Sequence, residues 1–172
     1  PAVPQMHALL MQYTAEQGIE SIAGGPLRFV SSGAAPLDPV WKRKAEAFYG
    51  IALQNGYGMT ETSAGVTTTK STFGDPDISV GPALTGIEIA IDESAEGGGN
   101  GIGEVLTRGP HIMLGYFRNP DATAAVLDKD GWMHTGDLGR IDADGYLWIT
   151  GRAKDLIIRG GHNIDPAMIE EA

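Results

Sequence analysis

The sequence predicts an α/β unit followed by a small antiparallel, β-barrel-like subdomain. In the first part, a strand, a helix and a second strand follow one another through short links, which is typical of parallel α/β units. After about Ser79, short strands alternate with turns, as they do in small antiparallel or barrel-like folds. We therefore expect residues 1–80 to form the first part and residues 81–151 the second.

The first element expected is a helix near the start of the chain. Val3, Met6, Leu10 and Tyr13 recur at helical spacing, and Gly18 follows as a stop signal. Such a spacing places these four side chains on one face of the helix.

The α/β unit itself is predicted from residue 27 onward. A short apolar run at Leu27–Ser31 is typical of a buried strand. Asp38 is suited to cap the helix that follows, with Pro39 in its first position and Gly50 at its end. Ile51–Leu53 is expected to be the next strand.

The second part shows alternation with a period of two. Ile87–Ile91 alternates apolar and polar residues, Val105–Thr107 forms a second run and Ile141–Ile149 a third. The glycines of Gly97–Gly101 predict a hairpin tip, and Asp142–Gly145 a tight turn. Asn119-Pro120-Asp121 predicts the start of a short helix by the same capping logic as Asp38.

Composition narrows the possible functions. The 172 residues carry a formal net charge of -10 and show no basic stripe, which argues against binding the phosphate backbone of nucleic acid. No apolar run approaches the length of a transmembrane helix. The absence of cysteine excludes disulfides and suits a cytoplasmic protein. The four histidines lack metal-ligand spacing. The oligomeric state is left open.

Four segments carry the chemistry of the chain. They are Ser31–Leu37 (SSGAAPL), Tyr57–Glu61 (YGMTE), Gly131–Leu138 (GWMHTGDL) and Gly151–Asp155 (GRAKD). The order, spacing and residue identities of these segments resemble those of the adenylate-forming superfamily, which contains acyl-CoA synthetases, luciferases and peptide-synthetase adenylation domains. The resemblance extends nearly from end to end, and Gly160–Pro166 (GGHNIDP) is most similar to fatty-acyl-CoA synthetases.

The first two segments provide small residues and an aromatic face. Gly33, Ala34 and Ala35 follow a buried strand and lack bulk, so a flat base could lie against their backbone; a plain turn before the next helix is the alternative. Tyr57 offers a face for stacking on adenine, although an isolated Tyr-Gly pair is more often part of a core. The resemblance implies that both segments line an adenine and acyl-adenylate site.

The remaining candidates are polar. The Thr60 hydroxyl can donate to a phosphate oxygen, and Glu61 is a carboxylate of the kind that Mg²⁺ binds beside substrate phosphates. Asp137 suits a ribose diol, and the Arg152 guanidinium can reach the ribose or a phosphate. Taken alone, a Gly-Asp pair is usually a turn and an arginine a solvated side chain. The resemblance assigns Thr60 to the α-phosphate, Glu61 to the metal, and Asp137 and Arg152 to the ribose.

The resemblance also implies a hinge and a route for coenzyme A. It places Lys154 at the hinge about which a small C-terminal domain rotates, so residues 152–172 are expected to be the hinge and the start of that domain. It places Gly160 and Gly161 beside the pantetheine tunnel. A linker lysine and a hairpin tip remain the alternatives. The complete set of nucleotide- and coenzyme-binding residues expected is Gly33, Ala34, Ala35, Asn55, Gly56, Tyr57, Gly58, Met59, Thr60, Asp137, Arg152, Gly160 and Gly161.

The implied activity is that of an AMP-forming acyl-CoA synthetase, which uses ATP, Mg²⁺ and coenzyme A to activate a carboxylic acid, here expected to be a fatty acid. We expect the chain to be an internal fragment, because the family's phosphate loop and its catalytic lysine lie outside it. Such a fragment is predicted to bind nucleotide weakly and not to turn over. A non-catalytic scaffold, and a relative that adenylates aryl or amino acids, are the alternatives.

Overall fold

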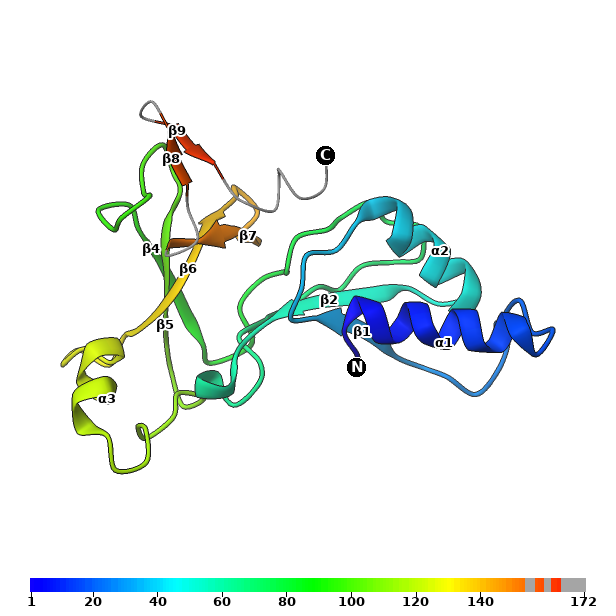
Figure 1. Cartoon of the computed structure of the whole chain (residues 1–172), viewed down its shortest axis with the longest axis horizontal. Helices are drawn as coiled ribbons and strands as arrows, with labels where there is room; N and C mark the ends of the chain where they lie inside the picture. The colour runs from blue at the N-terminus through cyan, green and yellow to red at the C-terminus, as the bar shows by residue number, and fades with distance from the viewer. Residues whose placement is uncertain (154–156, 160–161, 165–172) are drawn as a thin grey trace.

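The computed structural model describes residues 1–153, 157–159 and 162–164 (Figure 1). Lys154, Gly160 and Gly161, predicted as the hinge and the coenzyme A contacts, lie outside the described residues. The elements of the first part are α1 (Pro4–Glu16), β1 (Val30–Gly33), α2 (Pro39–Tyr49), β2 (Leu53–Tyr57), the 3₁₀ helix η1 (Thr60–Thr62) and β3 (Thr67–Thr68).

The predicted parallel pair is confirmed. β1 and β2 run parallel, with Val30 opposite Leu53 and Gly33 opposite Gly56, and β3 pairs antiparallel with β2. β1 begins later than expected, at Val30, which is the first residue that pairs with β2; Phe29 before it is 59% exposed. β2 begins at Leu53, the last residue of the predicted Ile51–Leu53 strand, and extends to Tyr57, so the prediction was placed too early. The two parallel strands end at the same edge of the sheet.

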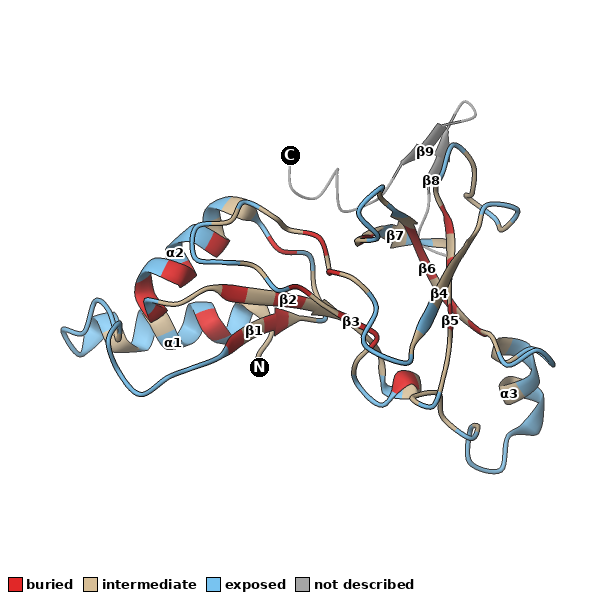
Figure 2. Ribbon diagram, turned by 180° about the vertical axis from the view of Figure 1, so that it is seen from behind, coloured by how far each residue is buried: buried red, intermediate tan, exposed pale blue. Residues whose placement is uncertain are grey.

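Helix α2 covers this sheet as its sequence predicts. The backbone N–H of Trp41 donates to Oδ1 of the Asp38 cap at 2.6 Å, and Gly50 ends the helix with φ of 71°. Ala45 and Phe48 are buried and belong to the same core cluster as the two strands (Figure 2). Burial of this face stabilises the unit, at about 25 cal/mol for each Å² of apolar surface removed from water.

Helix α1 forms where predicted, but its apolar stripe is not buried. Met6 is 60% exposed and Tyr13 62% exposed. The residue that anchors the helix is the buried His7, whose Nδ1 lies 2.7 Å from the Tyr49 hydroxyl and whose Nε2 lies 3.0 Å from the Ser31 carbonyl. Helix α1 is therefore held on α2 and β1 by the polar contacts of His7, together with Met11, which is partly buried against the core.

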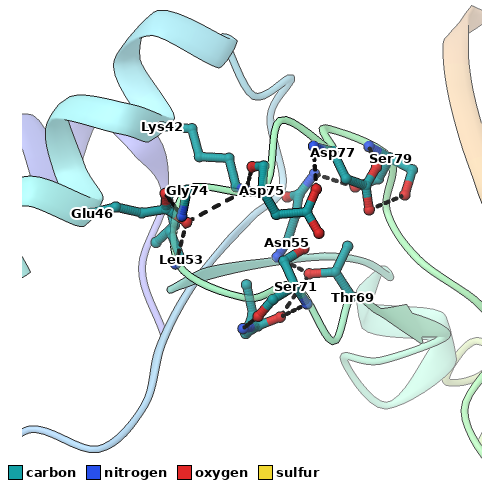
Figure 3. A network of polar contacts seen from close by, with 11 residues as sticks. Lys42, Glu46, Leu53, Asn55, Thr69, Ser71, Gly74, Asp75, Asp77 and Ser79 are labelled. Atoms are coloured by element: carbon teal, nitrogen blue, oxygen red, sulfur yellow. Dashed lines mark hydrogen bonds and ion pairs between the residues drawn. The ribbon is translucent and has the colours of Figure 1, made fainter. Parts of the chain in front are cut away.

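A buried ion pair within α2 is hydrogen-bonded to the start of β2 and to the loop that follows β3 (Figure 3). Lys42 Nζ lies 3.4 Å from Oε1 of Glu46, and both side chains are almost completely buried. The Glu46 carboxylate also accepts the backbone N–H groups of Leu53 at 3.0 Å and Gly74 at 3.1 Å, while Lys42 donates to the carbonyl of Asp75. Every charge is therefore compensated, as buried charges must be.

The second part is an open antiparallel sheet with strand order β4-β5-β6-β7. Among the described residues this sheet does not close into the barrel that the sequence suggested, since β4 and β7 form its two edges. Its elements are β4 (Glu88–Asp92), β5 (Gly103–Arg108), α3 (Pro120–Val126), β6 (Met133–Ile141) and β7 (Leu147–Arg152), followed by the hairpin β8 (Ile157–Arg159) and β9 (His162–Ile164).

The expected turns and cap of this part are present. Gly97–Gly101 lies between β4 and β5, and Asp142–Gly145 lies between β6 and β7. The Asn119 side chain accepts the N–H of Ala122 at the start of α3. Asp137 lies within β6 and not in a turn, because β6 continues to Ile141 through its pairing with β7.

The segment between β3 and β4 is joined to β7 of the second sheet by backbone hydrogen bonds. Val80 N–H donates to the Leu147 carbonyl at 2.9 Å, and Leu147 N–H donates to the Gly81 carbonyl at 3.0 Å. Figure 1 shows β2 pointing from the helical side of the molecule toward the second sheet. In the part of the chain that the structure describes, none of the helices has the length and apolar character needed to span a bilayer.

Candidate functional site

A cavity of about 520 Å³ lies at the carboxyl ends of β1 and β2. This is the edge at which open α/β sheets bind ligands. Gly33, Ala34, Gly56, Tyr57 and Gly58, five of the predicted residues, line it. The other lining residues are Pro1, Ala2, Val3, Met6, Ser31, Ser32, Ala64, Gly65, Thr67, Thr68 and Leu84.

Glycine is required in the wall of this cavity because backbone segments approach one another closely. A Cβ on Gly58 would lie 2.0 Å from the carbonyl oxygen of Ala64, and one on Gly56 would lie 2.9 Å from that of Thr67. The sequence suggested that these glycines leave room for a ligand beside Tyr57. The structure shows that they leave room for the loop that follows β2, which forms one wall of the cavity.

Asp137 and Arg152 come from two neighbouring strands of the second sheet, β6 and β7. Asp137 lies directly opposite Arg152 in the β6–β7 pairing, and Arg152 Nε donates to its Oδ1 at 2.9 Å. Gly136, with φ of 72°, and a register shift between Leu138 and Gly139 flank it. Bulges of this kind redirect side chains near functional sites. The Asp137 side chain is 8% exposed and that of Arg152 is 64% exposed.

Tyr57 connects the two sheets at this point. Its hydroxyl donates to Oδ2 of Asp137 at 2.5 Å, although the two residues are 80 positions apart. Burial raises the pKa of the Tyr57 hydroxyl, and the charge of Asp137 and the hydrogen bond to it raise this pKa further. Tyr57 therefore remains a neutral donor. Tyr57, Asp137 and Arg152 form one continuous hydrogen-bonded group.

Thr60 and Glu61 follow Tyr57 in the 3₁₀ helix η1. The Thr60 side chain is exposed. Glu61 is half-buried, and its Oε1 accepts a hydrogen bond from the Tyr116 hydroxyl at 2.8 Å. This hydrogen bond raises the pKa of Tyr116. The Glu61 main-chain carbonyl accepts the N–H of Met113 at 2.8 Å.

Tyr116 is a residue that sequence reasoning missed. It lies 55 positions after its partner Glu61, in the loop between β5 and α3, and no spacing rule connects the two. Its short distance from the Asn119 cap was the one available signal, since a capped helix start fixes the loop before it.

Other predicted residues lie away from the cavity. The Asn55 side chain is buried and donates to the Ser79 carbonyl at 2.9 Å, toward the loop that follows β3. The backbone N–H of Met59 donates to Oγ1 of Thr62 at 2.9 Å and so closes η1. Five further predicted residues do not line the cavity: Ala35, Thr60, Glu61, Asp137 and Arg152. Asp137 and Arg152 are linked to the cavity by hydrogen bonds through Tyr57, and Thr60 and Glu61 follow Tyr57 in the chain.

Glu61 has the donor chemistry for Mg²⁺. Within the described ranges no three acidic or histidine side chains gather as a metal site. Mg²⁺ bound with a nucleotide takes one or two carboxylates, the remaining ligands being phosphate oxygens and water. A single half-buried carboxylate with one oxygen already oriented by a tyrosine fits that requirement.

Known proteins match this chain over most of its length. The family model of AMP-binding enzymes matches residues 1–117. A sulfoacetate–CoA ligase of Cupriavidus necator is 41% identical over 148 residues, covering 85% of this chain and 29% of the ligase. A long-chain-fatty-acid–CoA ligase of Bos taurus is 42% identical over 145 residues, covering 81% of this chain and 19% of the ligase.

Solved structures agree. O-succinylbenzoate coenzyme A synthetase from Bacillus subtilis, in complex with ATP and magnesium ion, superposes with a TM-score of 0.82 at 31% identity, covering 99% of this chain and 35% of the synthetase. ATP-bound MatB from Rhodopseudomonas palustris superposes with a TM-score of 0.76 at 35% identity, covering 99% of this chain and 34% of MatB.

The chain spans 29% of the length of the sulfoacetate ligase and 19% of the fatty-acid ligase, so it corresponds to less than a third of each. Residues 1–117, which the family model matches, include the loops that follow β1 and β2, and with them Tyr57 and Glu61. The chain belongs to the AMP-binding enzyme family.

Proposed function

We propose that the protein is an AMP-forming acid–thiol ligase, and that this chain carries its nucleotide-binding centre. In the first step, a carboxylate oxygen attacks the α-phosphorus of ATP and pyrophosphate leaves, which gives an acyl-adenylate. In the second, the thiolate of coenzyme A attacks the acyl carbon and AMP leaves, which gives a thioester. Both steps depend on positioning and charge stabilisation rather than on covalent chemistry by the protein.

The observation that carries this proposal is the hydrogen-bonded group of Tyr57, Asp137 and Arg152 beside the cavity at the ends of β1 and β2. We assign the backbone of Gly33, Ala34 and Ala35 and the face of Tyr57 to adenine. A carboxylate accepts hydrogen bonds from two vicinal hydroxyls well, so we assign Asp137 to the ribose diol. Arg152, exposed over most of its side chain, can reach the ribose or a phosphate.

Thr60 and Glu61 serve the phosphates in this proposal. The exposed Thr60 hydroxyl is free to donate to an α-phosphate oxygen. Glu61 would hold Mg²⁺, which when bound neutralises phosphate charge. Asn55 and Met59 support the site indirectly in this proposal. The Asn55 side chain holds the loop after β3, and the Met59 backbone N–H holds η1.

The acid that we propose is a fatty acid, with coenzyme A as the thiol and the cytoplasm as the location. The sequence of Gly160–Pro166 and the 42% sequence identity to a long-chain-fatty-acid–CoA ligase support this choice. We retain Lys154 as the hinge and Gly160 and Gly161 as contacts of the pantetheine arm. An aryl or amino acid is the alternative substrate, and a panel of acids offered to the enzyme with ATP would distinguish them.

Calorimetric titration with AMP, and with a non-hydrolysable acyl-sulfamoyl adenosine, tests the proposal. The 172-residue chain should bind both weakly, and Tyr57→Ala and Asp137→Ala should abolish binding. Tyr13→Ala and Asp144→Ala are matched controls, because Tyr13 is exposed on α1 and Asp144 lies in an exposed turn. A folded chain that releases no heat with either ligand would instead be a scaffold.

A further inference from the structure

The loop between β5 and α3, residues 109–119, makes two hydrogen bonds to η1, and both are accepted by Glu61. Met113 N–H donates to the main-chain carbonyl of Glu61 at 2.8 Å, and the Tyr116 hydroxyl donates to Oε1 of the same glutamate at 2.8 Å. Backbone and side chain of Glu61 are therefore both held by one segment of the second part. Figure 1 shows this segment passing η1 on its way to α3.

Tyr116 is itself held from the other side by α3. Its N–H donates to Oγ1 of Thr123 at 2.9 Å, and Thr123 in turn donates to the Asn119 carbonyl at 2.9 Å. Gly115, with φ of 143°, permits the approach, since a Cβ there would lie 2.9 Å from the Thr123 methyl group. The backbone of Tyr116, from which its ring projects, is thus held by the first turn of α3.

This arrangement differs from ordinary packing. Tyr116 is 37% exposed and its neighbours Leu114 and Phe117 are 105% and 87% exposed, so the loop buries little apolar surface. What holds it on η1 is the pair of hydrogen bonds to Glu61. The second carboxylate oxygen, Oε2, accepts no hydrogen bond from the described residues. One oxygen is oriented by the protein and the other is left for a ligand.

We propose that Tyr116 is a positioning residue that orients the Glu61 carboxylate toward the magnesium ion of the bound nucleotide. The inference rests on the proposed function. Tyr116 touches neither nucleotide nor metal in this role; it selects the rotamer of Glu61 and occupies Oε1, which leaves Oε2 available to the ion. Outer hydrogen bonds of this kind commonly change metal affinity by about 10- to 100-fold.

The test compares ATP affinity in Mg²⁺ with ATP affinity in EDTA, both measured by calorimetry on the 172-residue chain. We expect Mg²⁺ to strengthen ATP binding to the wild-type protein. In Tyr116→Phe, which loses only the hydroxyl, the ratio of the two affinities should fall about tenfold. Tyr13→Phe removes an exposed hydroxyl on α1 and should keep the wild-type ratio.

A double-mutant cycle with Glu61→Gln locates the effect. If Tyr116 acts through Glu61, then Tyr116→Phe should not change the ratio further in the Glu61→Gln background. An equal loss of affinity in Mg²⁺ and in EDTA would show a merely structural role and overturn the proposal. An unchanged ratio in Tyr116→Phe, or no effect of Mg²⁺ on the wild-type protein, would overturn it as well.

The result separates this inference from the proposed function. Binding of AMP in EDTA does not involve the metal, so its absence in the wild-type protein would contradict the proposed function itself. Normal AMP binding without the Tyr116 effect would contradict only the inference. Should Tyr116→Phe fail to fold by thermal melting, Thr123→Val carries the same comparison, because it removes the acceptor of the Tyr116 N–H while keeping the side-chain volume.

Discussion

The hydroxyl of Tyr57 donates a 2.5 Å hydrogen bond to Oδ2 of Asp137 and thereby joins the end of β2 to the middle of β6. Arg152 donates to the other oxygen of the same carboxylate at 2.9 Å. A single buried carboxylate is thus shared by the two sheets. Four testable predictions concern this carboxylate, its donor Tyr57, the loop that lines the cavity, and the buried Lys42–Glu46 pair.

Asp137→Asn should lower the affinity for AMP about 10- to 100-fold. The change removes the charge that would accept from the ribose diol, and hydrogen bonds to charged groups contribute about 1.5–3 kcal/mol. Calorimetric titration with AMP measures the loss, and Asp144→Asn in the exposed turn is the control. A 2′,3′-dideoxy AMP lacks the diol, so it should bind the wild-type protein and Asp137→Asn alike. Discrimination between those two proteins by the dideoxy ligand would refute the ribose assignment.

Tyr57→Phe should make the protein less sensitive to alkaline pH. Burial raises the pKa of Tyr57 above the value of about 10 that a tyrosine has in an unfolded chain. Above pH about 10 the unfolded state therefore releases this proton while the folded state keeps it, and the free energy of unfolding falls as the pH rises. Urea denaturation between pH 8 and pH 11, as an approximate range, should show a shallower decline in Tyr57→Phe. Identical slopes in both proteins would mean that Tyr57 ionises normally.

Gly58→Ala should disrupt the loop that lines the cavity. Its Cβ would lie 2.0 Å from the Ala64 carbonyl oxygen, and a backbone oxygen can move away only if the loop moves with it. Overpacking of this kind costs about 1–3 kcal/mol, and AMP binding should be lost with it. Gly65→Ala is the matched control in the same loop, because its Cβ would approach the flexible end of Leu84 at 3.3 Å. Thermal melting of both variants, with AMP titration of Gly58→Ala, decides the point; equal losses of stability in the two variants would argue against a backbone clash.

Lys42→Met should destabilise the fold by about 3–5 kcal/mol, because it leaves the buried Glu46 carboxylate without its cation. Lys44→Met on the exposed side of the same helix should change the free energy of unfolding by less than about 0.5 kcal/mol. Urea denaturation measures both. Equal effects at positions 42 and 44 would show that the pair is not buried in solution.

Sequence patterns were sufficient where local chemistry decides the structure. The Asp38 cap, Pro39 and Gly50 determine α2 almost to the residue, since the capping hydrogen bond and the left-handed Gly50 are properties of a few neighbouring positions. The Asn119 cap determines the start of α3 for the same reason. The four motifs also identified the family, and the match over residues 1–117 confirms it.

Where long-range pairing decides the structure, the sequence was less informative. Nothing in the order of residues shows that β4 and β7 remain apart as the edges of an open sheet, or that β6 continues past Asp137. Strand ends depend on whether a partner strand continues to offer hydrogen bonds, and this depends on the whole sheet. The buried Lys42–Glu46 pair was equally invisible, because Lys and Glu at this helical spacing usually lie on the surface.

The sequence by itself determined the family and predicted the site residues: the small-residue loop after β1, Tyr57 with Thr60 and Glu61 after β2, and Asp137 with Arg152. The tertiary structure alone decided which of them touch. It placed Tyr57 on Asp137 and Tyr116 on Glu61, pairs separated by 80 and 55 positions. Local propensity acts over a few residues, whereas these contacts exist because β2 and η1 are packed against the second sheet and its loop, which no local pattern encodes.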